Sequence, residues 1–218
     1  MFRVKICGIT NRVDAQRVAD AGADAIGLNF YAGSPRCCPA DDAVKIAQVV
    51  PPHVVKVGVF VDSTADEIRR ICRQVGLDLV QLHGDQPPEF LQALRPLPVM
   101  KAFRLDGDFD EITAYLRACH RLMCVPRLLL VDAHRPGQFG GTGETVDWKA
   151  LAEHRRALVG LPLVLAGGLN PQNVADAIDA VRPWGVDTAS GVEDNPGKKS
   201  GKLVEQFVAA AQRALAKL

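Results

Sequence analysis

Short apolar runs alternate with helical patterns along the whole chain. The runs are rich in Val, Ile and Leu and last only a few residues each, as in strands that are buried on both faces. Between them, apolar residues recur at intervals of three and four positions, which is typical of one face of a helix. The pattern predicts strands near residues 3–8, 25–30, 54–61, 78–82, 98–103, 127–132, 162–166 and 185–188.

Repeated units of strand and helix predict a barrel. Eight units in 218 residues leave about 27 residues for each, which is compact but feasible for this fold. The alternative is an open doubly wound sheet, which usually has fewer strands and a switch point. No proline-rich linker or low-complexity tract marks a domain boundary. We therefore predict an α/β protein with a single (β/α)8 TIM barrel that forms one domain over residues 1–218.

Two helices have predictable boundaries. Thr64 and Glu67 have the spacing of a capping box before the helix that follows the third strand, and Gly76 suits its C-terminal end. After the seventh strand, Asn170 is the predicted N-cap and Pro171 the predicted first helical residue.

The charge and cysteine content exclude several classes of protein. Lys and Arg number 26 against 25 Asp and Glu, and no basic run stands out, so nucleic acid and membranes are not expected as partners. The beginning, "MFRVKICGIT", lacks the long apolar segment of a secretory signal. The six cysteines show no CxxC pair and no zinc-ligand spacing. We expect reduced thiols, no bound metal and a cytoplasmic location.

Glycine-rich turns follow the last two predicted strands. The seventh strand ends in "LAGGLNPQNV", with Gly167 and Gly168, and the eighth ends in "VDTASGVE", with Ser190 and Gly191. Glycine lets backbone N–H groups approach an anion, and barrels frequently bind phosphate in the loops after strands seven and eight. Either motif alone could be an ordinary tight turn. Together they predict a phosphate site.

Cys7 stands at the end of the first predicted strand. Side chains alternate along a strand, so Lys5 and Cys7 share one face while Val4 and Ile6 share the other. The apolar pair should meet the helices, which points Lys5 and Cys7 into the barrel. A buried cysteine is often inert packing, so Cys7 alone does not establish chemistry. If Cys7 ionises, we expect the Lys5 charge to lower its pKa.

Asp132 ends the sixth predicted strand in the same way. In "LLLVDA", Leu128, Leu130 and Asp132 share the inward face, so a carboxyl and a thiol would face one pocket as a possible acid–base pair. A helix cap or loop carboxylate is the plainer alternative. The glycine-rich "HRPGQFGGTGETVDW" that follows is a candidate lid.

Other strand ends supply further polar candidates. Gln81 and His83 share a face at the end of strand four, and Arg36 follows strand two with a guanidinium suited to a carboxylate. Asp187 in strand eight could orient a substrate hydroxyl or cap a turn. Each of these residues is a weak signal by itself.

Seven short motifs follow one another along the chain in a characteristic order and spacing. They are "KICGIT", "SPR", "KVGVFV", "LVQLHGD", "VDA…P…GGTGETVDW", "LAGGLNPQNV" and "GVDTASGVE…PGKKS". Over essentially the whole chain they resemble the phosphoribosylanthranilate isomerase family of tryptophan biosynthesis. The resemblance implies an aldose–ketose isomerase that carries out a cofactor-free Amadori rearrangement. Its substrate would be a small phosphosugar–anthranilate, and the enzyme would act as a monomer or homodimer.

The resemblance also implies roles for individual residues. Cys7 matches the general base and Asp132 the general acid. Arg36 matches the residue near the anthranilate carboxylate, and His83 and Asp187 match substrate-binding positions. The phosphate-binding positions are Gly167, Gly168, Ser190 and Gly191.

Two departures and several rival functions qualify this picture. Cys37 and Cys38 stand where an aromatic and an aliphatic residue are usual, and Ala189 replaces a common serine. The isomerase of histidine biosynthesis uses an aspartate where Cys7 stands. A ribulose-phosphate epimerase would need metal-ligating histidines at strand ends, and only His83 is available. A non-catalytic phosphoester-binding barrel would give no reason for Cys7, Asp132 and the glycine-rich loop together.

Overall fold

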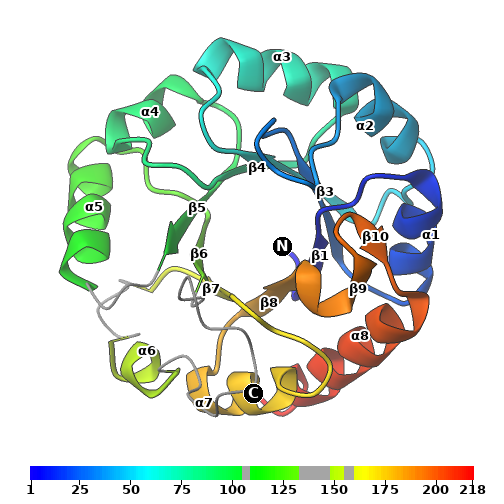
Figure 1. The fold of residues 1–218 in the computed structure, drawn as a ribbon. Helices are drawn as coiled ribbons and strands as arrows, with labels where there is room; N and C mark the ends of the chain where they lie inside the picture. The colour runs from blue at the N-terminus through cyan, green and yellow to red at the C-terminus, as the bar shows by residue number, and fades with distance from the viewer. Residues whose placement is uncertain (105–108, 133–147, 155–159) are drawn as a thin grey trace.

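Parallel strands close into a barrel that is ringed by helices (Figure 1). The computed structural model describes residues 1–104, 109–132, 148–154 and 160–218. The barrel strands are β1 (Val4–Cys7), β2 (Ala25–Asn29), β3 (Val55–Phe60), β4 (Leu79–Leu82), β5 (Val99–Arg104), β6 (Leu128–Asp132), β7 (Leu163–Ala166) and β8 (Gly185–Thr188). They pair in chain order, and β8 closes the ring against β1. The predicted TIM barrel is confirmed, and each predicted strand lies within a residue or two of an observed one.

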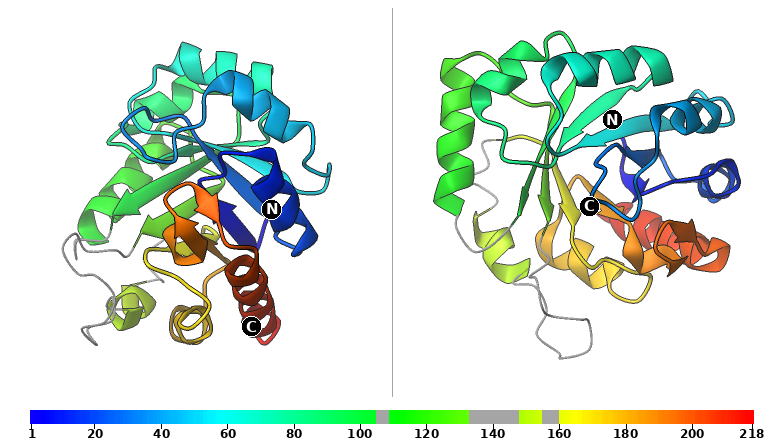
Figure 2. Two further views of the ribbon diagram at one scale, coloured as in Figure 1. Left: turned by 45° about the vertical axis from the view of Figure 1, so that its right-hand side comes forward. Right: turned by 45° about the horizontal axis from the view of Figure 1, so that its top comes forward.

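The helices lie outside the strands in every view (Figure 2). They are α1 (Arg12–Asp20), α2 (Ala40–Ala47), α3 (Ala65–Val75), α4 (Pro88–Ala93), α5 (Phe109–Arg121), α6 (Trp148–His154), α7 (Val174–Val181) and α8 (Gly201–Leu215). Two apolar layers result. One fills the space between strands and helices, and the other fills the barrel interior.

The alternation of side chains follows the prediction. Val4 and Ile6 pack in the outer layer, whereas Leu128 and Leu130 pack inside the barrel. Lys5 is fully buried on the inward face of β1. The C-terminal ends of all eight barrel strands therefore present their last inward side chains at one rim of the barrel.

The two predicted helix starts had different outcomes. The capping box of Thr64 and Glu67 is present at α3, and Gly76 ends that helix in the left-handed conformation at φ 73°. The predicted start of α7 was wrong, because the helix begins at Val174 after Asn173. The Asn170 side chain instead accepts hydrogen bonds from the backbone N–H groups of Gln172 and Asn173, which forms a turn before the helix.

A short hairpin beyond β8 was not predicted. Ser190–Val192 forms one 3₁₀ turn, and β9 (Glu193–Asn195) then pairs antiparallel with β10 (Lys198–Lys199). The hairpin lies beside the end of β1 in Figure 1. The Thr10 hydroxyl donates to the carbonyl of Gly197 at 2.6 Å, which joins the hairpin to the loop after β1.

Candidate active site

Cys7 is the last residue of β1 and lies half-buried at the rim. Its partner in the strand register is Gly27 of β2. A Cβ atom on Gly27 would lie 2.6 Å from Cys7 Sγ and 3.0 Å from Lys5 Nζ, so the thiol and the ammonium occupy the space that a larger residue would fill. The missing side chain of Gly27 therefore makes room for both groups.

Asp187 of β8 holds Lys5 in place. Lys5 Nζ donates to Asp187 Oδ1 at 2.9 Å, and both side chains are almost completely buried. Burial opposes a charge on Lys5, but attraction to Asp187 and Cys7 outweighs it and raises the Lys5 pKa. Burial also raises the pKa of the Asp187 carboxyl, and Lys5 offsets only part of this. Lys5 is thus a protonated amine beneath the thiol.

The expected net lowering of the Cys7 pKa was wrong, although Lys5 itself acts on this pKa in the expected direction. Burial of the thiol raises the Cys7 pKa above its ordinary value of 9.0. Lys5 and Lys199 act in the opposite direction, but the negative charge of Asp187 works against them. The Lys5 charge is shared with a carboxylate of β8, the strand that closes the ring against β1.

Asp132 ends β6 on the opposite side of the ring from β1 (Figure 1). His83, one residue past β4, places Nε2 3.8 Å from Asp132 Oδ2, and both side chains are partly exposed. Gln81 Nε2 lies 3.0 Å from His83 Nδ1. Burial lowers the His83 pKa more than Asp132 raises it, so the imidazole is neutral at pH 7. A thiol and a carboxyl therefore face the same rim from different sides.

Lys101 supports the loop that carries His83 and was missed by the sequence reasoning. Its ammonium group donates to the Gly84 carbonyl, one residue beyond His83. The same group lies 5.2 Å from the Phe103 ring centroid and 5.6 Å from that of Tyr115. Burial lowers the Lys101 pKa to about 8. A lysine within the apolar run from Val99 to Phe103 was the available signal.

Arg36 lies over the loop that follows Cys7. A Cβ atom on Gly8, whose φ is +76°, would lie 2.5 Å from Arg36 Cδ. The Arg36 guanidinium forms a forked pair with Glu193 of β9, with Nε at 2.9 Å from Oε1 and Nη2 at 2.7 Å from Oε2. The bond to Glu193 raises the Arg36 pKa. Sequence reasoning missed Glu193, although it is the only acid in the quoted "GVDTASGVE" besides Asp187.

The two glycine-rich loops meet at the rim between β7 and β8. Gly167 and Gly168 have φ of 98° and 64°, a conformation that favours glycine. A Cβ on Gly191 would overlap the Leu169 carbonyl oxygen, so the two loops are in direct contact. Thr188 Oγ1 also donates to this carbonyl at 2.6 Å. Glycine at 191 is therefore required by this close approach.

Three other sequence expectations concern the surroundings of the rim. Cys38 is buried at 1% exposure in the outer layer, so of the cysteine pair only Cys37 is partly exposed. Residues 133–147, which include most of the candidate lid, lie outside the described residues. Among the described residues, no group of three or more His, Cys, Asp or Glu could hold a metal ion, and no helix could cross a membrane.

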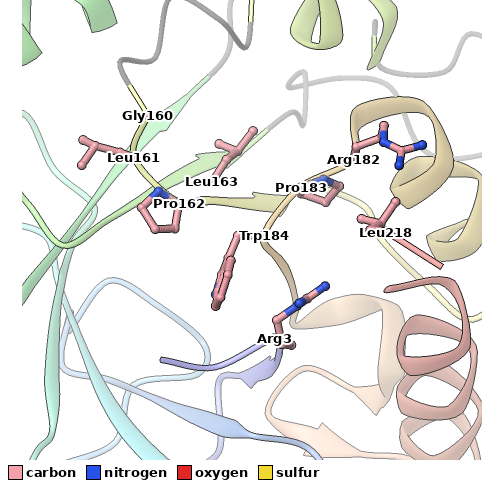
Figure 3. Close-up of a pocket in the computed structure, with 9 residues that line it drawn as sticks. All are labelled: Arg3, Gly160, Leu161, Pro162, Leu163, Arg182, Pro183, Trp184 and Leu218. Carbon is pink, nitrogen blue, oxygen red and sulfur yellow. The ribbon is translucent and has the colours of Figure 1, made fainter. Parts of the chain in front are cut away.

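A separate hollow of about 540 Å³ lies at the other end of the barrel (Figure 3). Its lining includes Arg3, Pro162 and Trp184. These residues directly precede β1, β7 and β8, respectively. The Arg3 guanidinium lies 5.0 Å from the Trp184 ring centroid. This hollow shares no residue with the rim that carries Cys7 and Asp132.

Comparisons with known proteins converge on one family. The family model described as N-(5'-phosphoribosyl)anthranilate (PRA) isomerase matches residues 4–210. The N-(5'-phosphoribosyl)anthranilate isomerase of Rubrobacter xylanophilus is 44% identical over 216 residues, which are 97% of this chain and 100% of that protein. The protein of the same name from Myxococcus xanthus is 46% identical over 210 residues, 96% of each chain.

Solved structures agree with the sequence relatives. Phosphoribosyl anthranilate isomerase from Thermotoga maritima superimposes with a TM-score of 0.86 at 39% identity, covering 98% of this chain and 100% of that one. A structure of the isomerase in complex with reduced 1-(o-carboxyphenylamino)-1-deoxyribulose 5-phosphate gives a TM-score of 0.84 at 38% identity, with the same coverage.

Proposed function

The chain belongs to the N-(5'-phosphoribosyl)anthranilate isomerase family, and we propose that it performs this isomerisation with Cys7 as general base and Asp132 as general acid. The reaction is an aldose–ketose isomerisation in tryptophan biosynthesis. It converts N-(5'-phosphoribosyl)anthranilate to 1-(2-carboxyphenylamino)-1-deoxyribulose 5-phosphate. The observation that carries the proposal is the placement of a thiol and a carboxyl on opposite sides of one rim, next to two touching glycine loops.

The acid acts first in this mechanism. Asp132 gives a proton to the ring oxygen of the ribose, the bond from C1' to that oxygen breaks, and the anilino nitrogen lone pair forms an iminium with C1'. The iminium makes the C2' proton far more labile than an ordinary sugar C–H. Each positioned acid or base typically contributes about 10²–10⁴-fold to such a step.

The base completes the rearrangement. The Cys7 thiolate removes the C2' proton, the electron pair of that bond forms the C1'–C2' double bond, and the iminium is neutralised. The resulting enol then becomes the ketone as C1' takes up a proton and the C2' hydroxyl gives up its own. No electrons leave the substrate, so the rearrangement needs no redox cofactor.

The remaining residues bind the two ends of the substrate. Arg36 receives the anthranilate carboxylate, because its Nη1 makes no hydrogen bond within the described part of the chain. The phosphate binds at Gly167, Gly168, Ser190 and Gly191. His83 contacts the substrate beside Asp132, and Asp187 offers Oδ2 to a sugar hydroxyl while Lys5 holds Oδ1.

The proposal extends to the location, the domain organisation and the partners of the protein. The protein acts in the cytoplasm as one barrel domain over residues 1–218, without nucleic acid or membrane partners. It is a monomer or a homodimer, and one related Thermotoga maritima structure is of monomers generated from a dimeric isomerase.

A growth test and a direct assay examine this function. The gene for this chain should let a bacterium that lacks the isomerase grow without tryptophan. The purified protein should consume the fluorescent anthranilate substrate. A folded, soluble protein that does neither would contradict the proposal, and binding of the phosphosugar without turnover would identify a binding protein instead.

A further inference from the structure

A buried carboxylate joins two cations beside the rim. Glu193 Oε1 accepts from Lys199 Nζ at 2.7 Å, and its two oxygens also accept the forked pair from Arg36. The side chains of Glu193 and Lys199 are 4% and 0% exposed. A buried ion pair of this kind needs good geometry and further hydrogen bonds to offset desolvation.

Lys199 carries the connection to the proposed phosphate loop. Its Nζ also donates to the Ala189 carbonyl at 3.0 Å, directly before Ser190 and Gly191. Its backbone N–H donates to Asp14 Oδ2 of α1 at 2.9 Å, which fixes β10 against the first helix. The ammonium of Lys199 is therefore held between the loop after β8 and the carboxylate that holds Arg36.

The charges of the cluster favour a fixed arrangement. Burial opposes ionisation of Glu193, but the bonds from Arg36 and Lys199 outweigh it and hold the Glu193 pKa below its ordinary value. Glu193 Oε1 accepts in addition from the Gly197 N–H at 3.2 Å, in the turn of the hairpin. The carboxylate is thus ionised and its oxygens are occupied on several sides.

We propose that Glu193 and Lys199 are positioning residues that couple the two ends of the substrate site. Through Arg36 the pair fixes the group that receives the anthranilate carboxylate. Through Ala189 it fixes the loop that receives the phosphate. Neither residue touches the substrate, and binding at one end favours the arrangement needed at the other. This inference rests on the proposed substrate.

The test compares truncated ligands in matched variants. Affinity is measured for reduced 1-(o-carboxyphenylamino)-1-deoxyribulose 5-phosphate, for its form without the phosphate, and for its form without the carboxylate. The variants are Glu193→Gln and Lys199→Met. Asp194→Asn and Lys198→Met make the same changes at exposed neighbours in the same hairpin and serve as controls.

The truncation penalty is the factor by which affinity falls when the ligand loses its carboxylate or its phosphate. Coupling predicts that each variant changes both of these penalties. In Glu193→Gln the loss of affinity on removing the carboxylate should shrink by about fivefold or more, and so should the loss on removing the phosphate. Lys199→Met should show the same double change although it leaves the Arg36–Glu193 pair in place. The two controls should keep the wild-type penalties.

Other outcomes overturn the proposal. If Glu193→Gln alters only the carboxylate penalty and Lys199→Met only the phosphate penalty, the two residues act separately. Unchanged penalties in both variants would mean that the cluster is purely structural. If Glu193→Gln does not fold, Lys199→Met decides alone. Absence of turnover in the wild type would contradict the proposed function, whereas the affinity ratios test the coupling independently of turnover.

Discussion

Lys5 Nζ lies 2.9 Å from Asp187 Oδ1 inside the barrel, two residues before Cys7 on the same face of β1. The cation closest along the strand to the proposed base is therefore already paired. Burial then dominates the thiol and raises its pKa. The Cys7 thiol therefore loses its proton only in the alkaline range. If Cys7 is the base, the reaction rate should rise with pH.

The first prediction concerns Cys7 itself. Cys7→Ser should reduce kcat by about 10²–10⁴-fold, because a hydroxyl does not ionise in the range where a thiol does. The assay is steady-state consumption of the anthranilate substrate by fluorescence. Cys37→Ser, at another partly exposed cysteine, is the control and should retain activity. Full activity in Cys7→Ser would exclude Cys7 as the base.

The second prediction concerns Asp132. Asp132→Asn should lower kcat by about 10²–10⁴-fold, as Cys7→Ser does, because an amide cannot give the ring oxygen a proton. Affinity for the reduced product analogue should remain close to that of wild type. Asp62→Asn removes an exposed carboxylate shortly after β3 and should leave kcat unchanged. An active Asp132→Asn enzyme would require a different acid.

The third prediction concerns Lys5 and Asp187, the buried ion pair, which shift the Cys7 pKa in opposite directions. Lys5 lowers the Cys7 pKa and Asp187 raises it. With Cys7 as the proposed base, kcat/KM should rise with pH as the thiolate forms. Lys5→Met should therefore move this rise to higher pH, and Asp187→Asn should move it to lower pH. Equal midpoints in the two variants would show that neither charge reaches the thiol.

The fourth prediction concerns the space opposite Cys7. Gly27→Ala would place a methyl group 2.6 Å from Cys7 Sγ and 3.0 Å from Lys5 Nζ. Overpacking of this kind typically costs about 1–3 kcal/mol, and displacement of the base could lower kcat/KM by on the order of 10²-fold. Gly201→Ala is the control, because its methyl would be 3.9 Å from the nearest atom, in Arg17. Wild-type kinetics in Gly27→Ala would show that the thiol has another position available.

The fifth prediction concerns the stability contributed at Lys101. Burial lowers its folded-state pKa from 10.5 to about 8, so the unfolded chain binds more protons between these values. The free energy of unfolding should therefore gain up to about 3 kcal/mol from this group as pH rises through that window. Lys101→Met should lose this gain in urea denaturation at pH 7.5 and 10.

The control for Lys101 is an exposed lysine of the hairpin. Lys198→Met should keep the pH dependence of the wild-type protein, because Lys198 is exposed to solvent. An identical pH dependence in Lys101→Met and wild type would show that the Lys101 ammonium stays hydrated in the folded state.

The sequence by itself determined the strands, the barrel and the direction of the main side chains. Strands buried on both faces leave short apolar runs, and the period of two places Cys7 and Asp132 on the inward face without knowledge of any neighbour. The capping box at Thr64 is similarly local, since both of its partners lie within one helical turn.

Only the tertiary structure decided which charges meet and what burial does to them. Lys5 and Asp187 are 182 positions apart, and Arg36 and Glu193 are 157 apart, so no local pattern connects them. Their contacts depend on closure of the barrel and on the hairpin after β8. The Cys7 pKa depends on the balance between desolvation and these charges, and that balance exists only when the strands are assembled.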